Sequence, residues 1–119
     1  MLREATGIRK IYLRAGRTDL RKGIYSLQAM IQMETGISPL EEGTMFLFCG
    51  KRPDRIKILV FEGDGWLIMT KHLIGGNRFQ WPRNSGDTLN LTREQYCHLM
   101  DGFTIDGTIR HISGQNPSE

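Results

Sequence analysis

Three carboxylates that lie close together in the sequence are the first candidates for chemistry. Asp54, Glu62 and Asp64 fall within one predicted hairpin, and clustered carboxylates are what a metal-dependent nuclease uses to hold its ions. A nuclease of the Pro-Asp…Glu-x-Lys type needs a lysine two residues after its second acid, but Asp64 occupies that position after Glu62. Turn chemistry explains Asp54 and Asp64 without a metal. These residues therefore do not predict a nuclease.

Histidines and cysteines are the other residue types that could hold a metal or act as nucleophiles. His72, His98 and His111 lack the i, i+4 spacing with which a helix presents two zinc ligands. Cys49 and Cys97 are the two cysteines, and their spacing is not that of metal ligands. In a reducing compartment we expect both to be buried thiols that pack as small hydrophobic residues. We therefore expect no enzyme activity, no metal and no cofactor.

Basic side chains interleaved with aromatic ones are better evidence, and they point to nucleic acid. Lys and Arg contact phosphates, and an exposed Trp66 or Trp81 could stack on a base. For Trp81 the core is favoured, because Phe79 and Trp81 alternate with polar residues. The candidate nucleic-acid contacts are Arg21, Lys22, Arg52, Arg55, Lys57, Lys71, His72 and Arg78.

The charge of the chain is unevenly distributed. The 119 residues carry a net charge of +3, but residues 3–22 and 51–83 have nets of +5 and +4, whereas residues 23–50 and 84–119 have −3 each. If the two basic segments fold side by side, they form a positive face that the total understates. The alternative is that these charges are scattered over a solvated surface.

Size and composition predict one globular domain. A chain that is 39% hydrophobic and 24% charged is ordinary for a soluble protein of this length. No apolar run approaches the roughly 18 residues of a membrane span, and the N-terminus lacks the apolar core of a signal peptide. We therefore expect a cytoplasmic protein with a single domain over residues 1–112. Residues 113–119 have no apolar content and are predicted to be a disordered tail.

The stretch from Met45 to Pro82 predicts the centre of the fold. An unbroken apolar run at residues 44–49 is typical of a central strand, and residues 55–61 alternate with period two. A two-residue turn at Gly63-Asp64 then begins a hairpin with residues 66–73. Its register would pair Phe61 with Trp66, Leu59 with Ile68, Lys57 with Thr70, and Arg55 with His72. A three-residue turn would instead place Lys71 opposite Lys57, where the two charges repel.

The remaining elements flank this hairpin. Residues 8–14, bounded by Gly7 and Gly16, predict a first strand, and residues 78–82 predict a further extended run with Phe79 and Trp81 on one face. Ile105, Ile109 and Ile112 are candidates for a last short strand. The expected fold is α+β, with a mainly antiparallel sheet of about five strands covered by two helices.

Two helical patterns supply that cover. Leu20, Ile24, Leu27 and Ile31 form one apolar stripe, with Thr18 or Asp19 as N-cap and Gly36 as the end. This start would place Arg21 and Lys22 in the first helical turn, where free N–H groups favour an anion; two solvated bases are the equal alternative. A second helix begins at Thr92, with a capping box through Gln95.

Four short motifs resemble one known family. They are Gly-Arg-Thr-Asp-Leu-Arg-Lys-Gly-Ile at 16–24, Asp-Arg-Ile-Lys-Ile-Leu at 54–59, Lys-His-Leu at 71–73 and Arg-Phe-Gln-Trp-Pro at 78–82. In this order they resemble the accessory protein from the second open reading frame of IS-66 family insertion sequences, labelled TnpB and distinct from the RNA-guided nuclease of that label. Departures fall at residues 74–77, at Phe61-Glu62 and at His72.

The resemblance implies a role in transposition beside a separate transposase, with no established catalytic residues. Together with the basic residues, it predicts a non-catalytic accessory protein that binds nucleic acid, in particular DNA of the element's ends, through a basic hairpin face. The alternative is an adaptor that binds only proteins, namely the transposase or the other accessory protein of the element.

Overall fold

The fold is a single sheet with a helix on each face. The computed structural model describes residues 7–38, 40–84, 87–102 and 110–111. In chain order its elements are β1 (Lys10–Arg17), α1 (Ile24–Thr35), β2 (Thr44–Cys49), β3 (Arg55–Phe61), β4 (Trp66–His72), β5 (Thr88–Leu91), α2 (Arg93–Met100) and β6 (Arg110–His111).

The sheet is mixed but mainly antiparallel. Its strand order is β4-β3-β2-β1-β5-β6, and only β1 and β2 run parallel, because α1 connects them as a crossover. The other neighbours within the described ranges pair antiparallel. The expected α+β fold with two covering helices is therefore confirmed, and the sixth strand is a pair of residues beside β5.

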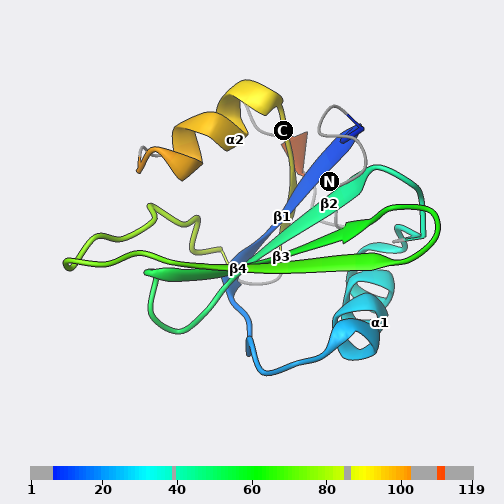
Figure 1. The fold of residues 1–119 in the computed structure, drawn as a ribbon, viewed down its shortest axis with the longest axis horizontal. Helices are drawn as coiled ribbons and strands as arrows, with labels where there is room; N and C mark the ends of the chain where they lie inside the picture. Colours follow the sequence, from blue (N-terminus) through cyan, green and yellow to red (C-terminus); the bar gives the residue numbers. More distant parts are fainter. Residues whose placement is uncertain (1–6, 39, 85–86, 103–109, 112–119) are drawn as a thin grey trace.

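Each face of the sheet buries its own hydrophobic cluster. On one face, Tyr12, Phe46 and Leu59 pack against Leu27 and Ile31 of α1. The opposite face carries the larger cluster, to which α2 contributes Leu99, and α1 and α2 lie on opposite sides of the sheet (Figure 1). All six residues of β2 are buried, which confirms its predicted central position and explains why its sequence is a continuous apolar run.

The β3–β4 hairpin has the predicted register. Phe61 faces Trp66 and Arg55 faces His72, with no shift between them. The N–H of Glu62 donates to the carbonyl oxygen of Gly65 at 2.8 Å, which leaves Gly63 and Asp64 as the two turn residues. Gly63 has φ = 91°, a conformation that residues with a Cβ rarely adopt.

The first strand departs from its prediction. It continues through Gly16 to Arg17 instead of ending before the glycine, because Gly16 forms a bulge with φ = 75°. The register against β2 shifts between Leu13 and Arg17, and the Gly16 N–H donates to the carbonyl oxygen of Pro82 at 2.8 Å. After the bulge, Arg17 pairs with Cys49 of β2, so β1 stays in the sheet with a shifted register.

The run at residues 78–82 is extended, but it is not a strand of the sheet. Its side chains nevertheless alternate as predicted, since Phe79 and Trp81 are 2% and 9% exposed while Arg78 and Gln80 are exposed. The Trp81 indole N–H donates to the carbonyl oxygen of Arg14 at 3.0 Å. The core position of Trp81 is therefore confirmed, and the exposed ring that stacking on a base would require is not present.

The strand β5, which lies beside β1, was not predicted from the sequence. β5 has only four residues and follows a polar stretch, so its alternation is too short to predict a strand; it forms by pairing antiparallel with β1. Of the last predicted strand, Ile105, Ile109 and Ile112 lie outside the described residues, as does the predicted tail at 113–119.

The first helix begins later than the sequence predicts. Its N-cap is Gly23, with neither Thr18 nor Asp19 in that role. The Asp19 carboxylate instead accepts the backbone N–H of Arg21 at 3.0 Å, and such a local bond competes with helix formation. Arg21 and Lys22 therefore lie in a turn before the helix, and the helix-terminus argument for an anion beside them is wrong. Gly36 ends the helix as predicted, with φ = 73°.

Neither helix is long and apolar enough to cross a bilayer, within the ranges that the structure describes.

The two cysteines differ in burial. Cys49 is buried in β2, but Cys97 lies exposed on α2, so its predicted burial is wrong. Leu99 is the α2 residue that enters the core, and Cys97, two positions earlier, points elsewhere. Burial raises the pKa of the Cys49 thiol to about 11.

The capping box of α2 gives the first testable prediction. The Gln95 N–H donates to Thr92 Oγ1 at 3.1 Å, and the Thr92 N–H donates to Gln95 Oε1 at 2.8 Å. Thr92→Ala removes the first bond, so the free energy of unfolding should fall by about 1 kcal/mol in urea denaturation. Thr92→Ser, which keeps the hydroxyl, should lie close to the unaltered protein. Equal stability of all three proteins would contradict the capping argument.

The cysteines give the second prediction. Iodoacetamide should alkylate one thiol of the native protein near pH 8, because Cys97 is exposed and Cys49 is buried with a raised pKa. Mass spectrometry should show a second alkylation only after unfolding, and Cys97→Ser should remove the reaction of the native state. Rapid alkylation of Cys49 in the folded protein would contradict its burial.

Candidate nucleic-acid interface

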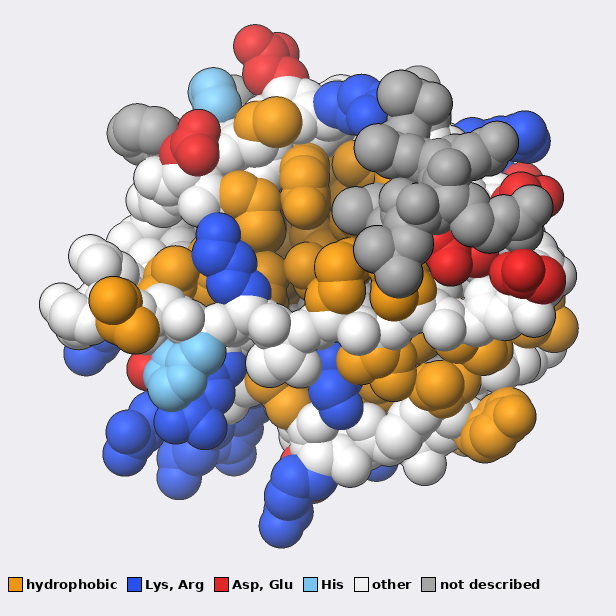
Figure 2. All heavy atoms as spheres, in the orientation of Figure 1, with side chains coloured by type: hydrophobic (Ala, Val, Ile, Leu, Met, Phe, Trp, Pro, Cys, Tyr) orange, Lys and Arg blue, Asp and Glu red, His pale blue; other side chains and the backbone are white. Residues whose placement is uncertain are grey.

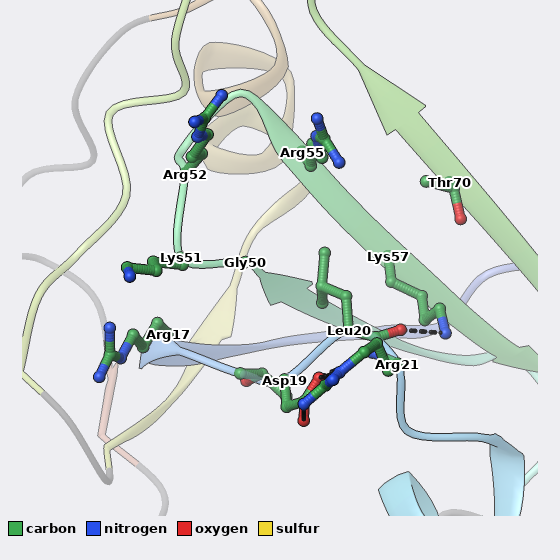
Figure 3. Close-up of a pocket in the computed structure, with 11 residues that line it drawn as sticks. Arg17, Asp19, Leu20, Arg21, Gly50, Lys51, Arg52, Arg55, Lys57 and Thr70 are labelled. Carbon is green, nitrogen blue, oxygen red and sulfur yellow. Dashed lines mark hydrogen bonds and ion pairs between the residues drawn. The ribbon is translucent and has the colours of Figure 1, made fainter.

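A hollow of about 1000 Å³ lies where the end of β1 meets the turn between β2 and β3. Its lining comes from the turn after β1, from residues 50–52, and from β3 and β4 (Figure 3). Six of its eleven residues are Lys or Arg and one is acidic. The lining residues are Arg17, Thr18, Asp19, Leu20, Arg21, Gly50, Lys51, Arg52, Arg55, Lys57 and Thr70.

The turn after β1 is held in place by Lys57. Its ammonium group donates to the carbonyl oxygens of Leu20 at 2.6 Å and of Lys22 at 3.0 Å, and Figure 3 shows the side chain reaching from β3 to this turn. The Thr18 N–H also donates to the carbonyl oxygen of Cys49 at 2.7 Å. Lys57 therefore positions the wall of the hollow, and its charge is already directed at protein carbonyls.

The single acid of the hollow is neutralised within it. Arg21 donates from Nε to Asp19 Oδ1 at 3.0 Å and from Nη2 to Oδ2 at 2.9 Å. These hydrogen bonds hold the pKa of the Asp19 carboxyl below its usual range. Asp19 thus stays ionised and paired, and the positive charge of the hollow comes from the other bases.

Four cations remain directed toward solvent. Arg17, Lys51 and Arg52 are exposed and make no ion pair with any residue in the described ranges, and Arg55 lies 3.7 Å from Asp54. Figure 3 shows these four side chains reaching out from three segments: the end of β1, the turn after β2 and the start of β3. Figure 2 shows Lys and Arg side chains gathered at its lower left.

A second hollow of about 480 Å³ adjoins the first and shares Arg17, Gly50 and Lys51 with it. It adds Arg78 and Arg83. We call the two hollows together the basic groove. Its bases are Arg17, Arg21, Lys51, Arg52, Arg55, Lys57, Arg78 and Arg83.

The structure brings five of the eight predicted residues into the basic groove. Arg21, Arg52, Arg55, Lys57 and Arg78 line it. The two basic segments of the sequence therefore meet here, which is the condition under which the charge pattern gives a positive face.

Three predicted residues do not line the basic groove. Lys22 lies beside it, in the turn before α1. Lys71 faces Ile56 and so projects from the other face of the sheet from Lys57. His72 Nε2 lies 3.5 Å from Asp54 Oδ2.

Arg17, Lys51 and Arg83 line the groove but were missed. Lys51 adjoins Arg52, and Arg17 belongs to the first family motif, so both had a signal in the sequence. Arg83 had none beyond its charge. Trp66, the other candidate for stacking, lies against Phe61 with ring centroids 5.0 Å apart and does not line the groove.

Metal chemistry finds no support in the part of the chain that the structure describes. No group of three or more His, Cys, Asp or Glu is arranged there to hold a metal ion. The chemistry that the basic groove offers is the binding of anions through several Lys and Arg side chains.

Comparison with known proteins agrees with the four motifs. The family described as IS66 Orf2 like protein matches residues 9–109. Two proteins of Sinorhizobium fredii are similar to this chain. Uncharacterized protein y4hO is 31% identical over 94 residues, which cover 79% of this chain and 80% of the relative. Uncharacterized protein y4jC is 28% identical over 103 residues, which cover 87% of this chain and 86% of the relative.

No solved structure matches this chain, so the fold is described from this structure alone. The family match spans β1 to the last residues before β6 and includes every residue of the basic groove. The chain therefore belongs to the IS66 Orf2-like family, the accessory proteins of IS66-type insertion-sequence transposition.

Proposed function

We propose that this protein is a non-catalytic transposition accessory protein that binds nucleic acid through the basic groove. The observation that carries the proposal is the charge of the groove. Six Lys and Arg side chains line its larger hollow, and the one acid there is already paired with Arg21. A concave surface lined by one sign of charge concentrates the electrostatic field and attracts a polyanion.

The arrangement of the cations supports a phosphate backbone as the ligand. Four cations from three segments of the chain line one hollow: Arg17, Lys51, Arg52 and Arg55. Asp54 lies 3.7 Å from Arg55, and the other three make no ion pair with a described residue. Bringing like charges together opposes folding, and an anion in the groove offsets that repulsion. The extension of the groove to Arg78 and Arg83 gives it the form of a track, which suits a chain of phosphates better than a single anion.

The groove is suited to positioning rather than to reading bases. Trp81 lines the second hollow but is 9% exposed, and Trp66 lies outside the groove. Stacking therefore contributes little, and phosphate contacts carry no sequence information. We propose DNA of the element's ends as the ligand, with the transposase of the same element supplying the chemistry and further sequence recognition. RNA and single-stranded DNA offer the same phosphates, so the binding experiment includes them as probes.

The third prediction is a charge reversal with a matched control. Arg52→Glu with Arg55→Glu should abolish a gel shift of element-end DNA, because two of the four solvent-directed cations become anions and the net charge falls by four units. Arg9→Glu with Lys10→Glu makes the same change in net charge at the opposite end of β1. Lys10 loses only an exposed ion pair with Glu41, which contributes little to stability. This control protein should still bind.

The salt dependence supplies an independent measure. Contacts from four cations predict a slope of log K against log salt of about −3 to −4, and single reversals at Arg52 or Arg55 should reduce its magnitude. Equal binding by the groove variant and its control would overturn the proposal. If the groove variant also kept transposition activity, the protein-only adaptor would become the better description.

The fourth prediction concerns the stability that Lys57 gives to the wall of the groove. Lys57→Met leaves the carbonyl oxygens of Leu20 and Lys22 without their charged donor. The free energy of unfolding should fall by about 2 kcal/mol. Lys71→Met removes the same charge from an exposed position on β4 and should change it by less than about 0.5 kcal/mol. Equal stabilities in chemical denaturation would contradict the anchoring role of Lys57.

A further inference from the structure

One edge of the sheet is open. β4 is the outermost strand on its side, with seven residues, no proline and no register shift against β3. Natural proteins usually protect such an edge with a bulge, a proline, several charges or a covering segment. Lys71 is the one Lys or Arg of β4. No described residue forms a hydrogen bond with the backbone groups of β4 that face away from β3.

The hydrogen-bond pattern of the hairpin fixes which backbone groups face outward. Glu62 and Gly65 form a hydrogen-bonded pair at the turn, and hydrogen-bonded pairs alternate with the other kind along an antiparallel ladder. Residues 67, 69 and 71 therefore direct their N–H and C=O groups to β3. Residues 66, 68, 70 and 72 direct theirs away from the sheet, where a further strand could bind them.

Hydrophobic side chains lie on both sides of this edge. Leu67 and Met69 are half-buried against the cluster that α2 covers. Trp66 and Ile68 are half-buried against the cluster that α1 covers. Figure 2 shows hydrophobic side chains gathered above and below the position that β4 has in Figure 1. A strand added at this edge would cover apolar surface as well as complete hydrogen bonds.

We infer that a second copy of this chain binds here, with the two β4 strands antiparallel and Met69 facing Met69 of the other copy. In this register Ile68 faces Thr70, Trp66 faces His72, and Leu67 faces Lys71. Residues 66, 68, 70 and 72 then pair with one another across the interface, so every outward backbone group of the strand finds a partner. The contact is isologous, as in most dimers.

Charge and length select this register. Antiparallel self-pairing must bring outward residues opposite outward residues, so the symmetry centre lies on a residue of the strand. Centring on Lys71 would bring two ammonium groups face to face. Centring on Ile68 or Thr70 would pair only five residues of each strand. Met69 is the centre that pairs all seven and keeps each Lys71 opposite an apolar side chain.

The dimer would place the larger hollows of both basic grooves on one side of a continuous sheet. Antiparallel neighbours in a sheet are related by an axis perpendicular to it, so equal faces point the same way. Lys57 and Thr70 project from the same face as Leu59, which packs toward α1, and both line the groove. Two grooves related by this axis would bind one duplex together, a consequence that rests on the proposed function, whereas the dimer itself does not.

A disulfide trap tests the register. In a Cys97→Ser background, Met69→Cys brings two thiols opposite each other in a non-hydrogen-bonded pair, where the Cα atoms are about 4.5 Å apart and a disulfide can form. Mild oxidation should give covalent dimers. Leu67→Cys is the matched control, since it lies on the same face and is also half-buried, but it faces Lys71 and should give no covalent dimer. No covalent dimer from Met69→Cys would overturn the inference.

A second variant tests the edge without a covalent bond. Thr70→Pro removes an outward N–H that β3 does not use, and proline is tolerated at such positions of edge strands. In sedimentation velocity, the fraction of dimer should rise with protein concentration for the unaltered chain, whereas Thr70→Pro should stay monomeric. The circular dichroism spectrum of Thr70→Pro should be unchanged, which shows that it is folded. A monomeric unaltered chain at every concentration would also overturn the inference.

These measurements contain no nucleic acid, so their result is independent of the proposed function. The Arg52→Glu, Arg55→Glu protein should still dimerise, because neither side chain belongs to β4. A protein that dimerises and fails to bind DNA would contradict only the proposed function. A protein that binds DNA as a monomer would contradict only the dimer.

Discussion

The contact of the Lys57 ammonium with the carbonyl oxygens of Leu20 and Lys22 is the interaction on which the functional surface depends. It joins the middle of β3 to the turn that leads from β1 into α1, two segments that are 37 residues apart in sequence. A cation replaces the backbone donors that these carbonyls would have in a helix. With the turn fixed in this way, Arg17 and Arg21 line the same hollow as Lys51 and Arg52.

The sheet supplies the rigid support for this contact. Because each face is covered by one helix, β2 is buried along its whole length, and the turn after it carries Lys51 and Arg52 from a fixed base. The bulge at Gly16 shifts the pairing of β1 with β2 so that Arg17 lies opposite Cys49, beside the turn that carries Lys51 and Arg52. Buried strands thus position exposed cations, which is how a small domain presents a charged surface with defined shape.

In the proposed function, this accessory protein of transposition acts through contacts with other molecules. The basic groove offers contacts to phosphates, and the open edge of β4 offers contacts to a second copy. The two surfaces are adjacent, because Thr70 belongs to both. Binding of a second copy at β4 would therefore affect how nucleic acid fits the groove, and the reverse. In a dimer, a duplex bound in the first groove would be present at a high effective concentration for the second groove.

The sequence by itself determined the elements that depend on neighbours in the chain. The hairpin register follows from alternation and from the Gly63-Asp64 turn, and the start of α2 follows from Thr92 and Gln95. The same alternation places Lys71 on the opposite face of the sheet from Lys57, although its charge had made it a candidate contact. The charge pattern identified the two basic segments, but it left open whether they meet or are scattered over the surface.

Tertiary structure decided the rest, because the deciding partners are distant in sequence. β5 exists through its pairing with β1, and the bulge at Gly16 through its bond to Pro82. The late start of α1 combines both kinds of cause: Asp19 bonds locally to Arg21, and Lys57 holds the carbonyls that an earlier helix would have used. Local propensity favours a helix there by a small margin, and a charged hydrogen bond from another strand exceeds it.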